Sequence, residues 1–305
     1  MIRINQIKLD IGTDEKILNS KIQKLLRLKN SSFTYSIVKK SIDARKKEHI
    51  MYIYSVDVKV DGIDETALVR KLNNKDIIIN KNIKYVFPQI KDTHKNKKIA
   101  IIGSGPAGLF CGLLLARAGF KPVIYERGGN VHERTGIVNA FFETGVLDTE
   151  TNIQFGEGGA GTFSDGKLNS VIKEKDGRIR KVLETFVEFG ASPEILYVNK
   201  PHVGTDVLSV VVSNIRNEII RLGGTVNFNS KVTDIYIDTG KITGIRVNDE
   251  YDEEFNAVVL APGHSARDTF EMLLKKGIEM EKKSFAVGMR IEHNQSLINN
   301  FAYGR

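Results

Sequence analysis

Cysteine is almost absent: the 305-residue chain contains only one, Cys111. A single thiol cannot form an internal disulfide, and there is no Cys-x-x-Cys pair that could pass electrons to a dithiol. Unpaired cysteine usage is typical of the cytosol, so we expect a cytoplasmic protein. Cys111 lies among small and apolar residues, so we expect it to be an inert packing residue.

Long apolar runs and metal-ligand spacings are also missing. No stretch is long enough to span a bilayer, and the N-terminus, Met-Ile-Arg-Ile-Asn, has no signal-peptide core. The six histidines are scattered and none pairs with a carboxylate at a recognised metal-binding interval. The sequence therefore predicts no membrane span and no metal site.

Acidic residues are scarce in the first third of the chain. Residues 1–98 hold 22 Lys and Arg against 11 Asp and Glu, whereas the whole chain has a net charge of +8. A basic front region can bind nucleic acid or an acidic partner. The densest clusters lack interleaved aromatic residues, which favours the alternative of a lysine-rich, solvated surface.

Residues 1–95 are predicted to form a small basic α+β domain. Alternating residues 2–9 predict a strand, and residues 33–40 and 50–60 predict two more. A helix capped by Asp14 is expected to carry Ile17, Ile22, Leu25 and Leu26 on one side, and residues 64–72 predict a second helix. A ferredoxin-like arrangement is one option. Residues 92–97 are polar and predict a linker.

A dinucleotide-binding motif follows this linker. The apolar run Ile99–Ile102 predicts a buried parallel strand, and Gly103-Ser-Gly105-Pro-Ala-Gly108 leads from it into a helix. Gly103 permits the tight turn, Gly105 lets the backbone approach a pyrophosphate, and Gly108 allows close packing of the helix on the strands.

An acidic residue stands at the end of the next apolar run, Pro122–Tyr125. Glu126 is placed to accept hydrogen bonds from a ribose 2′-hydroxyl and would repel a 2′-phosphate. Small residues continue at four-residue spacing in Gly112 and Ala116. This extended pattern, with Glu in place of Asp, favours FAD over NAD.

A second glycine-rich stretch occupies residues 154–170. Five glycines between Gly156 and Gly166 prevent regular structure, and the exposed amides, with Thr162, Ser164 and Lys167, suit a pyrophosphate or a flavin pyrimidine ring. The alternative is a flexible surface loop, although Phe155 and Phe163 are unusual in one. Lys167 is either a cation near the flavin or a plain surface residue.

The remaining pattern predicts alternating helices and strands. Helices are expected at residues 176–189, 205–222 and 265–277. Strands are expected within 225–238, in a hairpin to 247, at 255–263 and at 285–291. Residues 96–305 are thus predicted to form one α/β domain.

Three features together resemble the two-dinucleotide-binding-domain flavoproteins: Gly103–Glu126, the strand around Val232, and Ala257-Val-Val-Leu-Ala-Pro-Gly263. The stretch Gln154–Lys167 is similar to a signature of a bacterial family of NAD(P)/FAD-dependent oxidoreductases. The resemblance implies a glutathione-reductase-like, Rossmann-like FAD domain. It also implies that Val232 presents its backbone to adenine and that the Ala261–Gly263 turn runs beside FAD. Such flavoproteins usually continue further, so we expect residues 96–305 to be a C-terminally incomplete domain.

The expected function is that of an FAD-dependent oxidoreductase, which passes a hydride through non-covalent FAD to or from an unidentified small molecule, with NADH or NADPH as an optional electron donor. No second GxGxxG indicates a separate NADPH domain. Two alternatives stay open: a flavin-dependent tRNA-modifying enzyme or hydroxylase that grips RNA with the basic domain, and a non-catalytic flavin-binding fragment.

The sequence identifies no catalytic residue. Arg127 and Arg134 are either ligands of adenine or pyrophosphate or plain surface arginines, and His264 is either structural or faces the cofactor. The predicted cofactor-binding residues are Gly103, Ser104, Gly105, Pro106, Ala107, Gly108, Glu126, Arg127, Arg134, Gly158, Gly159, Gly161, Thr162, Ser164, Asp165, Gly166, Lys167, Val232, Ala261, Pro262 and Gly263.

Overall fold

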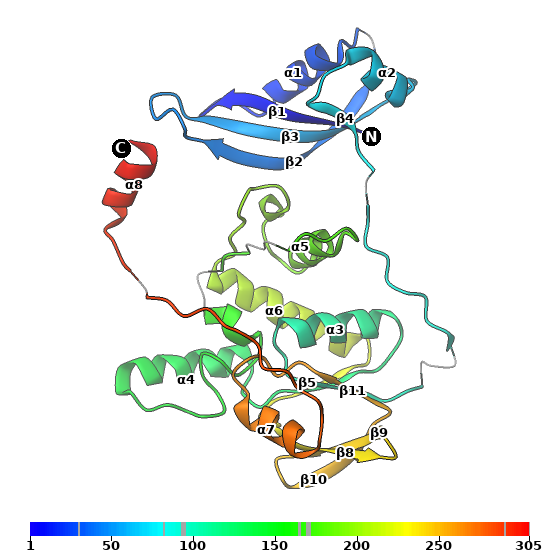
Figure 1. Cartoon of the computed structure of the whole chain (residues 1–305), viewed down its shortest axis with the longest axis vertical. Coiled ribbons are helices and arrows are strands. Elements are labelled where there is room, and N and C mark those ends of the chain that lie inside the picture. Colours follow the sequence, from blue (N-terminus) through cyan, green and yellow to red (C-terminus); the bar gives the residue numbers. More distant parts are fainter. Residues whose placement is uncertain are drawn as a thin grey trace.

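A computed structural model describes residues 1–29, 31–81, 83–92, 96–163, 166–168, 172–289 and 291–304. Its N-terminal part is a four-stranded antiparallel sheet with two helices, and the rest is built on a parallel sheet (Figure 1). No helix in the described ranges is both long and apolar enough to cross a membrane.

The N-terminal part has the ferredoxin-like arrangement that the sequence suggests. The strand order β2-β3-β1-β4, with one helix after β1 and one after β3, is the split βαβ pattern. Ile2, Ile4, Val56 and Val58 point to the side that carries the helices and are fully buried or nearly so. The elements are β1 (Ile2–Asp10), α1 (Ile17–Leu26), β2 (Phe33–Asp43), β3 (Met51–Val60), α2 (Glu65–Leu72) and β4 (Ile77–Ile79).

The parallel sheet has the order β11-β5-β6-β7 and is covered on both faces. Its strands are β5 (Ile99–Ile102), β6 (Val123–Tyr125), β7 (Thr225–Asn227) and β11 (Ala257–Leu260). Ile101 and Ile124 pack under α3 (Pro106–Arg117) and α6 (Thr205–Arg221), with Leu109 and Ile215. This confirms the predicted α/β class with a buried parallel sheet.

The opposite face of the parallel sheet carries a second, antiparallel sheet. Ala100, Ile102 and Tyr125 pack against Ile235 and Leu273 in this layer. The elements here are β8 (Val232–Asp238), β9 (Lys241–Val247), β10 (Tyr251–Glu254) and α7 (Arg267–Lys275). Other elements lie at the rim: α4 (Val131–Thr144), a 3₁₀ turn (Gly159–Phe163), α5 (Arg178–Glu188), a second 3₁₀ turn (Pro193–Leu196) and α8 (Gln295–Tyr303).

One backbone connection joins the two parts of the chain. The amide of Lys40, in β2, donates to the carbonyl of Tyr197 (2.7 Å), and the amide of Asn199 donates to the carbonyl of Lys40 (2.8 Å). β2 is an edge strand, so these bonds extend the N-terminal sheet by a short piece of the second part. The predicted division at residues 95 and 96 stays a prediction.

Four local expectations differ from the structure. Helix α4 was not expected, because Gly136 interrupts its weak apolar pattern, although Asn130 caps it. The short β4 was also missed. Asp14 does not cap α1, which begins after Lys16; it bonds to the Lys16 amide in the preceding turn. The strand expected at 285–291 is absent from the described residues 279–289 and 291–294, as no neighbouring strand pairs with them.

Candidate dinucleotide site

Three strands of the parallel sheet end at one cavity. Because β5, β6 and β11 are parallel, their carboxyl ends meet at one edge. Gly103–Gly108 follows β5, Glu126 follows β6 and Ala261–Gly263 follows β11, and all three segments contribute to the lining of a cavity of about 440 Å³. Open α/β sheets bind ligands at this position, and pockets for small molecules usually have such volumes.

The three glycines of the turn differ in what surrounds them. A Cβ atom on Gly103 would lie 2.4 Å from the carbonyl oxygen of Ala261, and its φ is +99°. A Cβ on Gly108 would lie 1.9 Å from the carbonyl oxygen of Gly103. At Gly105 the nearest atom would be the Cα of Gly159, at 3.9 Å. Gly103 and Gly108 are therefore required by the fold, whereas Gly105 keeps the cavity open.

The N-terminus of α3 opens onto this cavity. Gly105 is its cap residue and offers no side chain, and Pro106 occupies the first turn. Gly105, Pro106 and Ala107 all line the cavity. The partial positive charge and the free amides of a helix N-terminus attract anions, so this wall can hold a phosphate.

Glu126 is buried, with 5% of its surface exposed, and is fully hydrogen-bonded. Its Oε2 accepts from the amide (2.7 Å) and hydroxyl (2.9 Å) of Ser104. Its Oε1 accepts from the amides of Gly128 and Gly156, both at 3.0 Å. A carboxylate has about four acceptor positions. A ribose hydroxyl would therefore have to replace one of these donors.

Arg134, in α4, is completely buried, and its side chain bonds to the glycine-rich loop and the residues just before it. Its guanidinium donates to the carbonyls of Asn152, Ile153, Glu157 and Gly159, each at 2.8 Å, and to the hydroxyl of Thr162. Burial lowers the pKa of Arg134 to about 10, so it stays charged at neutral pH. Its donors hold the loop, and Arg134 is not among the described residues of the cavity wall, so its assignment as a cofactor ligand stays a prediction.

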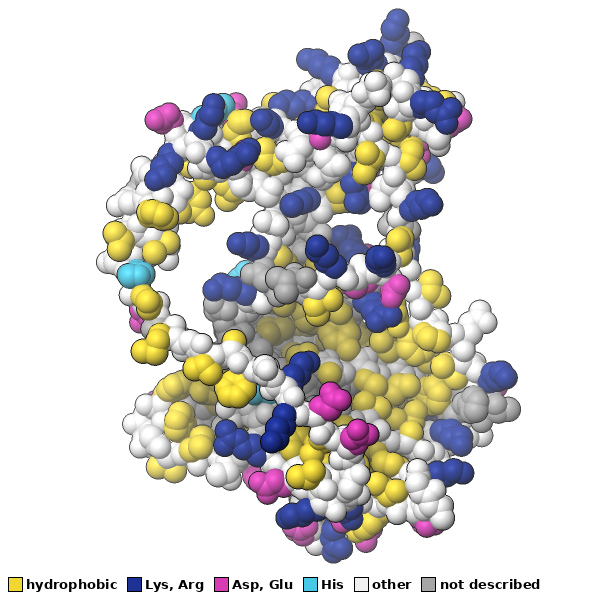
Figure 2. Space-filling view, viewed as in Figure 1, with side chains coloured by type: hydrophobic (Ala, Val, Ile, Leu, Met, Phe, Trp, Pro, Cys, Tyr) yellow, Lys and Arg dark blue, Asp and Glu magenta, His cyan; other side chains and the backbone are white. Residues whose placement is uncertain are grey.

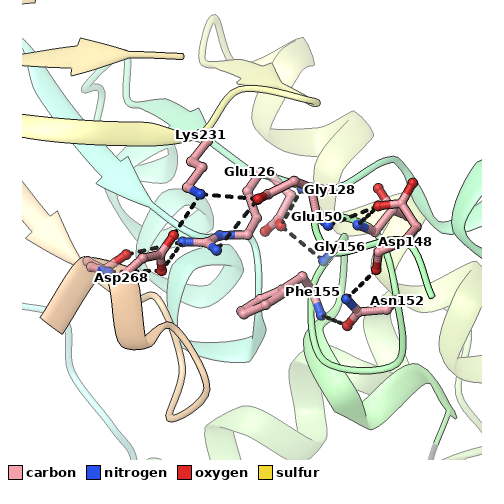
Figure 3. A network of polar contacts seen from close by, with 12 residues as sticks. Glu126, Gly128, Asp148, Glu150, Asn152, Phe155, Gly156, Lys231 and Asp268 are labelled. Carbon is pink, nitrogen blue, oxygen red and sulfur yellow. Dashed lines mark hydrogen bonds and ion pairs between the residues drawn. The ribbon is translucent and has the colours of Figure 1, made fainter. Parts of the chain in front are cut away.

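Arg127 lines the cavity but is neutralised by Glu150 and Asp268, the two acids that Lys231 connects in Figure 3. Its Nη2 donates to Asp268 at 2.9 Å, and its Nη1 lies 3.5 Å from a carboxylate oxygen of Glu150. Lys231 bridges the same two acids, at 2.7 Å to Asp268 and 3.1 Å to Glu150. We call these four residues the charge ring. The Arg127 guanidinium also lies 4.4 Å from the centre of the Phe155 ring, which fixes its orientation.

The charge ring lowers the pKa of one of its two acids, Asp268. Burial alone would raise the pKa of Asp268, but hydrogen bonds from Arg127 and Lys231 outweigh this effect and hold the pKa well below its usual 3.8.

Glu157, in the glycine-rich loop, is fully buried, and its pKa is shifted in the opposite direction. Burial raises its pKa, although the Val131 amide and Arg216 partly oppose this. Its Oε1 has no hydrogen-bond partner among the described residues.

The predicted residues separate into two groups. Those on the cavity wall are Gly103, Gly105, Pro106, Ala107, Glu126, Arg127, Gly159, Gly161, Val232, Ala261, Pro262 and Gly263. Those away from it are Ser104, Gly108, Arg134, Gly158, Thr162, Gly166 and Lys167. Ser104 and Thr162 are buried, and each bonds within the site. Ser164 and Asp165 lie outside the described residues.

Lys167 lies on the far end of the glycine-rich loop. It is exposed and forms a β-bridge opposite His202, while the Leu168 amide donates to the carbonyl of Pro201. Gly166 is required there, because a Cβ would lie 1.7 Å from the Val203 carbonyl oxygen. Lys167 is not among the described residues that line the cavity, and its contact with a flavin stays a prediction.

Several lining residues were not predicted. Among them, Gln154, Ser230 and Thr269 supply polar groups. His264, for which the sequence left open a position facing the cofactor, lines the cavity with its Nε2 3.3 Å from the Ser265 hydroxyl. One signal was available for Ser230, since it lies two residues before Val232, the first residue of β8. Thr269 lies inside helix α7. The sequence does not indicate that this helix lies beside the carboxyl ends of the parallel strands.

The fold and the cavity define a dinucleotide-binding protein of the α/β class. Residues 97–297 match the family profile described as pyridine nucleotide-disulphide oxidoreductase, and residues 1–59 match a domain of unknown function. The chain belongs to the pyridine nucleotide-disulphide oxidoreductase family, as the flavoprotein resemblance of the sequence indicates.

Individual proteins are similar to this chain over different lengths. An uncharacterized protein of Clostridium beijerinckii is 47% identical over 305 residues, which are 99% of this chain and 56% of that protein. The chain thus spans little more than half the length of this relative. Among solved structures, L-proline dehydrogenase from P. horikoshii is similar with 14% identity and a TM-score of 0.40, over 61% of this chain and 57% of that one. Glycine oxidase from Bacillus cereus has 16% identity and a TM-score of 0.38, over 60% of each chain.

Proposed function

We propose that the protein is an FAD-dependent oxidoreductase that binds FAD non-covalently in the 440 Å³ cavity and takes electrons from NADH or NADPH. The observation that carries this proposal is the meeting of the α3 N-terminus, Glu126 and the Ala261–Gly263 turn on one cavity wall. The family, whose name includes the pyridine nucleotides, supports the same chemistry.

The residues of the cavity fit the parts of FAD. The N-terminus of α3 would hold the pyrophosphate, since it has no side-chain cap and Gly105 leaves room for a close approach. Glu126 would take a ribose hydroxyl by exchanging one of its four donors. Val232, at the start of β8, would place its backbone next to adenine.

The flavin supplies the redox chemistry when bound, because it accepts and passes on a hydride. The chain contributes position and the exclusion of water: Leu260, Pro262 and Ala160 form apolar parts of the wall. His264 follows the Ala261–Gly263 turn directly and lines the cavity, with its Nε2 3.3 Å from the Ser265 hydroxyl.

A thiol relay is not part of the proposal. Cys111 is the only cysteine among the 305 residues. It lies in α3, and burial raises the pKa of its thiol. A thiol with a raised pKa is a weak nucleophile at neutral pH. We therefore propose a small molecule as the partner in electron transfer in place of a dithiol formed by these residues.

No specific feature favours the RNA-binding alternative. Single-stranded RNA is commonly held by aromatic side chains on an open sheet face. The described face of the N-terminal sheet opposite its helices instead carries Arg3, Asn5, Ser36, Ser55 and Asp57.

The test compares two glycine substitutions. Gly105→Ala places a methyl group on the cavity wall, whereas Gly136→Ala places one in open space in α4. We expect Gly105→Ala to weaken FAD binding at least about tenfold, measured by quenching of flavin fluorescence, and Gly136→Ala to leave it unchanged.

Two results would contradict the proposal. The first is an FAD affinity that is the same in wild type and Gly105→Ala. The second is that NADH and NADPH, added without oxygen, do not bleach the visible absorbance of the bound oxidised FAD. That result would indicate a flavin-binding protein without this activity.

A further inference from the structure

A second cleft lies where the N-terminal part faces the rest of the chain, and Figure 2 shows Lys and Arg side chains on both sides of this boundary. Its volume is about 860 Å³, roughly twice that of the dinucleotide cavity. One wall is the face of the N-terminal sheet opposite its helices, and the other is α5 with Leu196. The connecting residues Asn80, Lys81, Ile83, Lys84 and Tyr85 close one side.

The floor of the cleft is a rigid polar surface. Asp57, in β3, is 5% exposed and accepts two hydrogen bonds from Arg3, at 2.8 and 2.9 Å, and one from Asn80 at 2.9 Å. Arg3 and Asp57 are direct cross-strand neighbours in the sheet. A sheet face with this composition does not serve as an apolar packing surface.

Positive charge is in excess on the walls. The lining includes six cationic side chains, Arg3, Lys39, Lys81, Lys84, Arg180 and Lys181, and three acids, Asp57, Glu174 and Glu184. The acids are engaged: Asp57 pairs with Arg3, Glu184 with Arg180 at 2.9 Å, and Glu174 accepts from the Asp176 and Ile179 amides. Within the described ranges, the four lysines have no ion-pair partner.

Local geometry brings these lysines to the cleft. The pairing of β2 with β3 shifts by one residue between Ile37 and Lys39, so Val38 and Lys39 both line the cleft. Such a bulge redirects a side chain that regular alternation would point to the opposite face. On the other wall, Gly177 has a φ of +76°, and a Cβ there would lie 2.9 Å from the Tyr85 amide nitrogen. This close approach holds the connecting residues against α5.

We propose that this cleft is a binding site for a small molecule that carries two or more phosphate groups. Lysine ammonium groups bind phosphate as mobile point charges, and lysines on opposite walls suit a ligand with separated charges. Bringing such an anion into the cleft relieves the repulsion between the unpaired lysines. The site is separate from the dinucleotide cavity, as the two share no lining residue in the part of the chain that the structure describes.

Inorganic pyrophosphate is the probe, measured by calorimetry at low salt without flavin. We expect the Lys39→Ala/Lys181→Ala chain to bind it at least about tenfold more weakly than wild type. The control is Lys24→Ala/Lys71→Ala, which removes the same charge from α1 and α2, on the opposite face of the sheet. It should retain the wild-type affinity, and unchanged thermal unfolding should show that both chains fold.

A second arm separates this proposal from the proposed function, because pyrophosphate could also bind at the α3 N-terminus. Gly105→Ala should leave pyrophosphate affinity unchanged. The proposal is overturned if wild type does not bind pyrophosphate, if both double variants lose equal affinity, or if only Gly105→Ala weakens binding. It is also overturned if a short single-stranded RNA binds at least tenfold more tightly than pyrophosphate and depends on the same two lysines.

Discussion

The carboxylate of Glu126 accepts two hydrogen bonds from Ser104, one from its amide at 2.7 Å and one from its hydroxyl at 2.9 Å. Through them, the end of β6 holds the turn after β5 in place. The other oxygen of Glu126 holds the amides of Gly128 and Gly156, so one side chain orders three segments around the cavity. The residue predicted to bind ribose thus also has a structural role.

Replacing Glu126 with Gln tests this role. Whichever way the amide is turned, its NH₂ group would face two donors, so we expect a loss of about 2–4 kcal/mol. The melting temperature should fall by at least about 4 °C, because 1 kcal/mol corresponds to about 2–4 °C in a domain of this size. Glu188→Gln, at an exposed ion pair with Arg117, is the control and should change it little. Equal melting temperatures would refute the structural role.

Arg134→Lys tests the buried centre of the glycine-rich loop. A lysine keeps the charge but has three donors on a flexible stem, and it cannot replace a planar group that bonds to five carbonyls and Thr162. We expect a loss of at least about 3 kcal/mol, measured by chemical denaturation. Arg178→Lys is the control, since this exposed arginine bonds only to Asp176 within the described residues. A loss below about 1 kcal/mol would show that Arg134 does not organise the loop.

Asp268 gives the charge ring a defined pH dependence. Its folded-state pKa is lowered, so its stabilising contribution is complete above its usual pKa of 3.8 and is lost as the pH falls below it. Asp268→Asn should therefore lower the melting temperature at pH 7, and the difference from wild type should shrink as the pH is reduced toward 3. Melting curves from pH 3 to 8 measure this. A difference that is constant over this range would contradict the linkage.

The parallel sheet and the GxGxxG turn could be predicted because their signals are local. Alternation, apolar runs and glycine spacing each depend on a few neighbouring residues. The role of Arg134 could not be predicted, because its partners between residues 152 and 162 come together only when the loop folds around it. The charge ring was missed for the same reason, since Arg127 and Asp268 are 141 positions apart.

The prediction of a strand at residues 285–291 was wrong for a different reason. Its alternation is real, but a strand needs a neighbouring edge to bond with, and sequence does not say whether one lies within reach. In the structure the odd-numbered apolar residues are exposed: Phe285 and Val287 at 85%, Met289 at 94% and Ile291 at 74%. These apolar side chains therefore do not pack against the parts of the chain that the structure describes.

This exposure makes a prediction about stability. The double substitution Phe285→Ser/Val287→Ser removes little buried apolar surface, so we expect the melting temperature to change by less than about 2 °C. Ile101→Val is the matched control: its side chain is fully buried between the parallel sheet and α3, and the loss of one methylene should cost about 0.5–1.5 kcal/mol. Differential scanning calorimetry compares the three chains at one protein concentration. A larger loss in the double variant than in Ile101→Val would mean that residues 285–287 are packed against the rest of this chain.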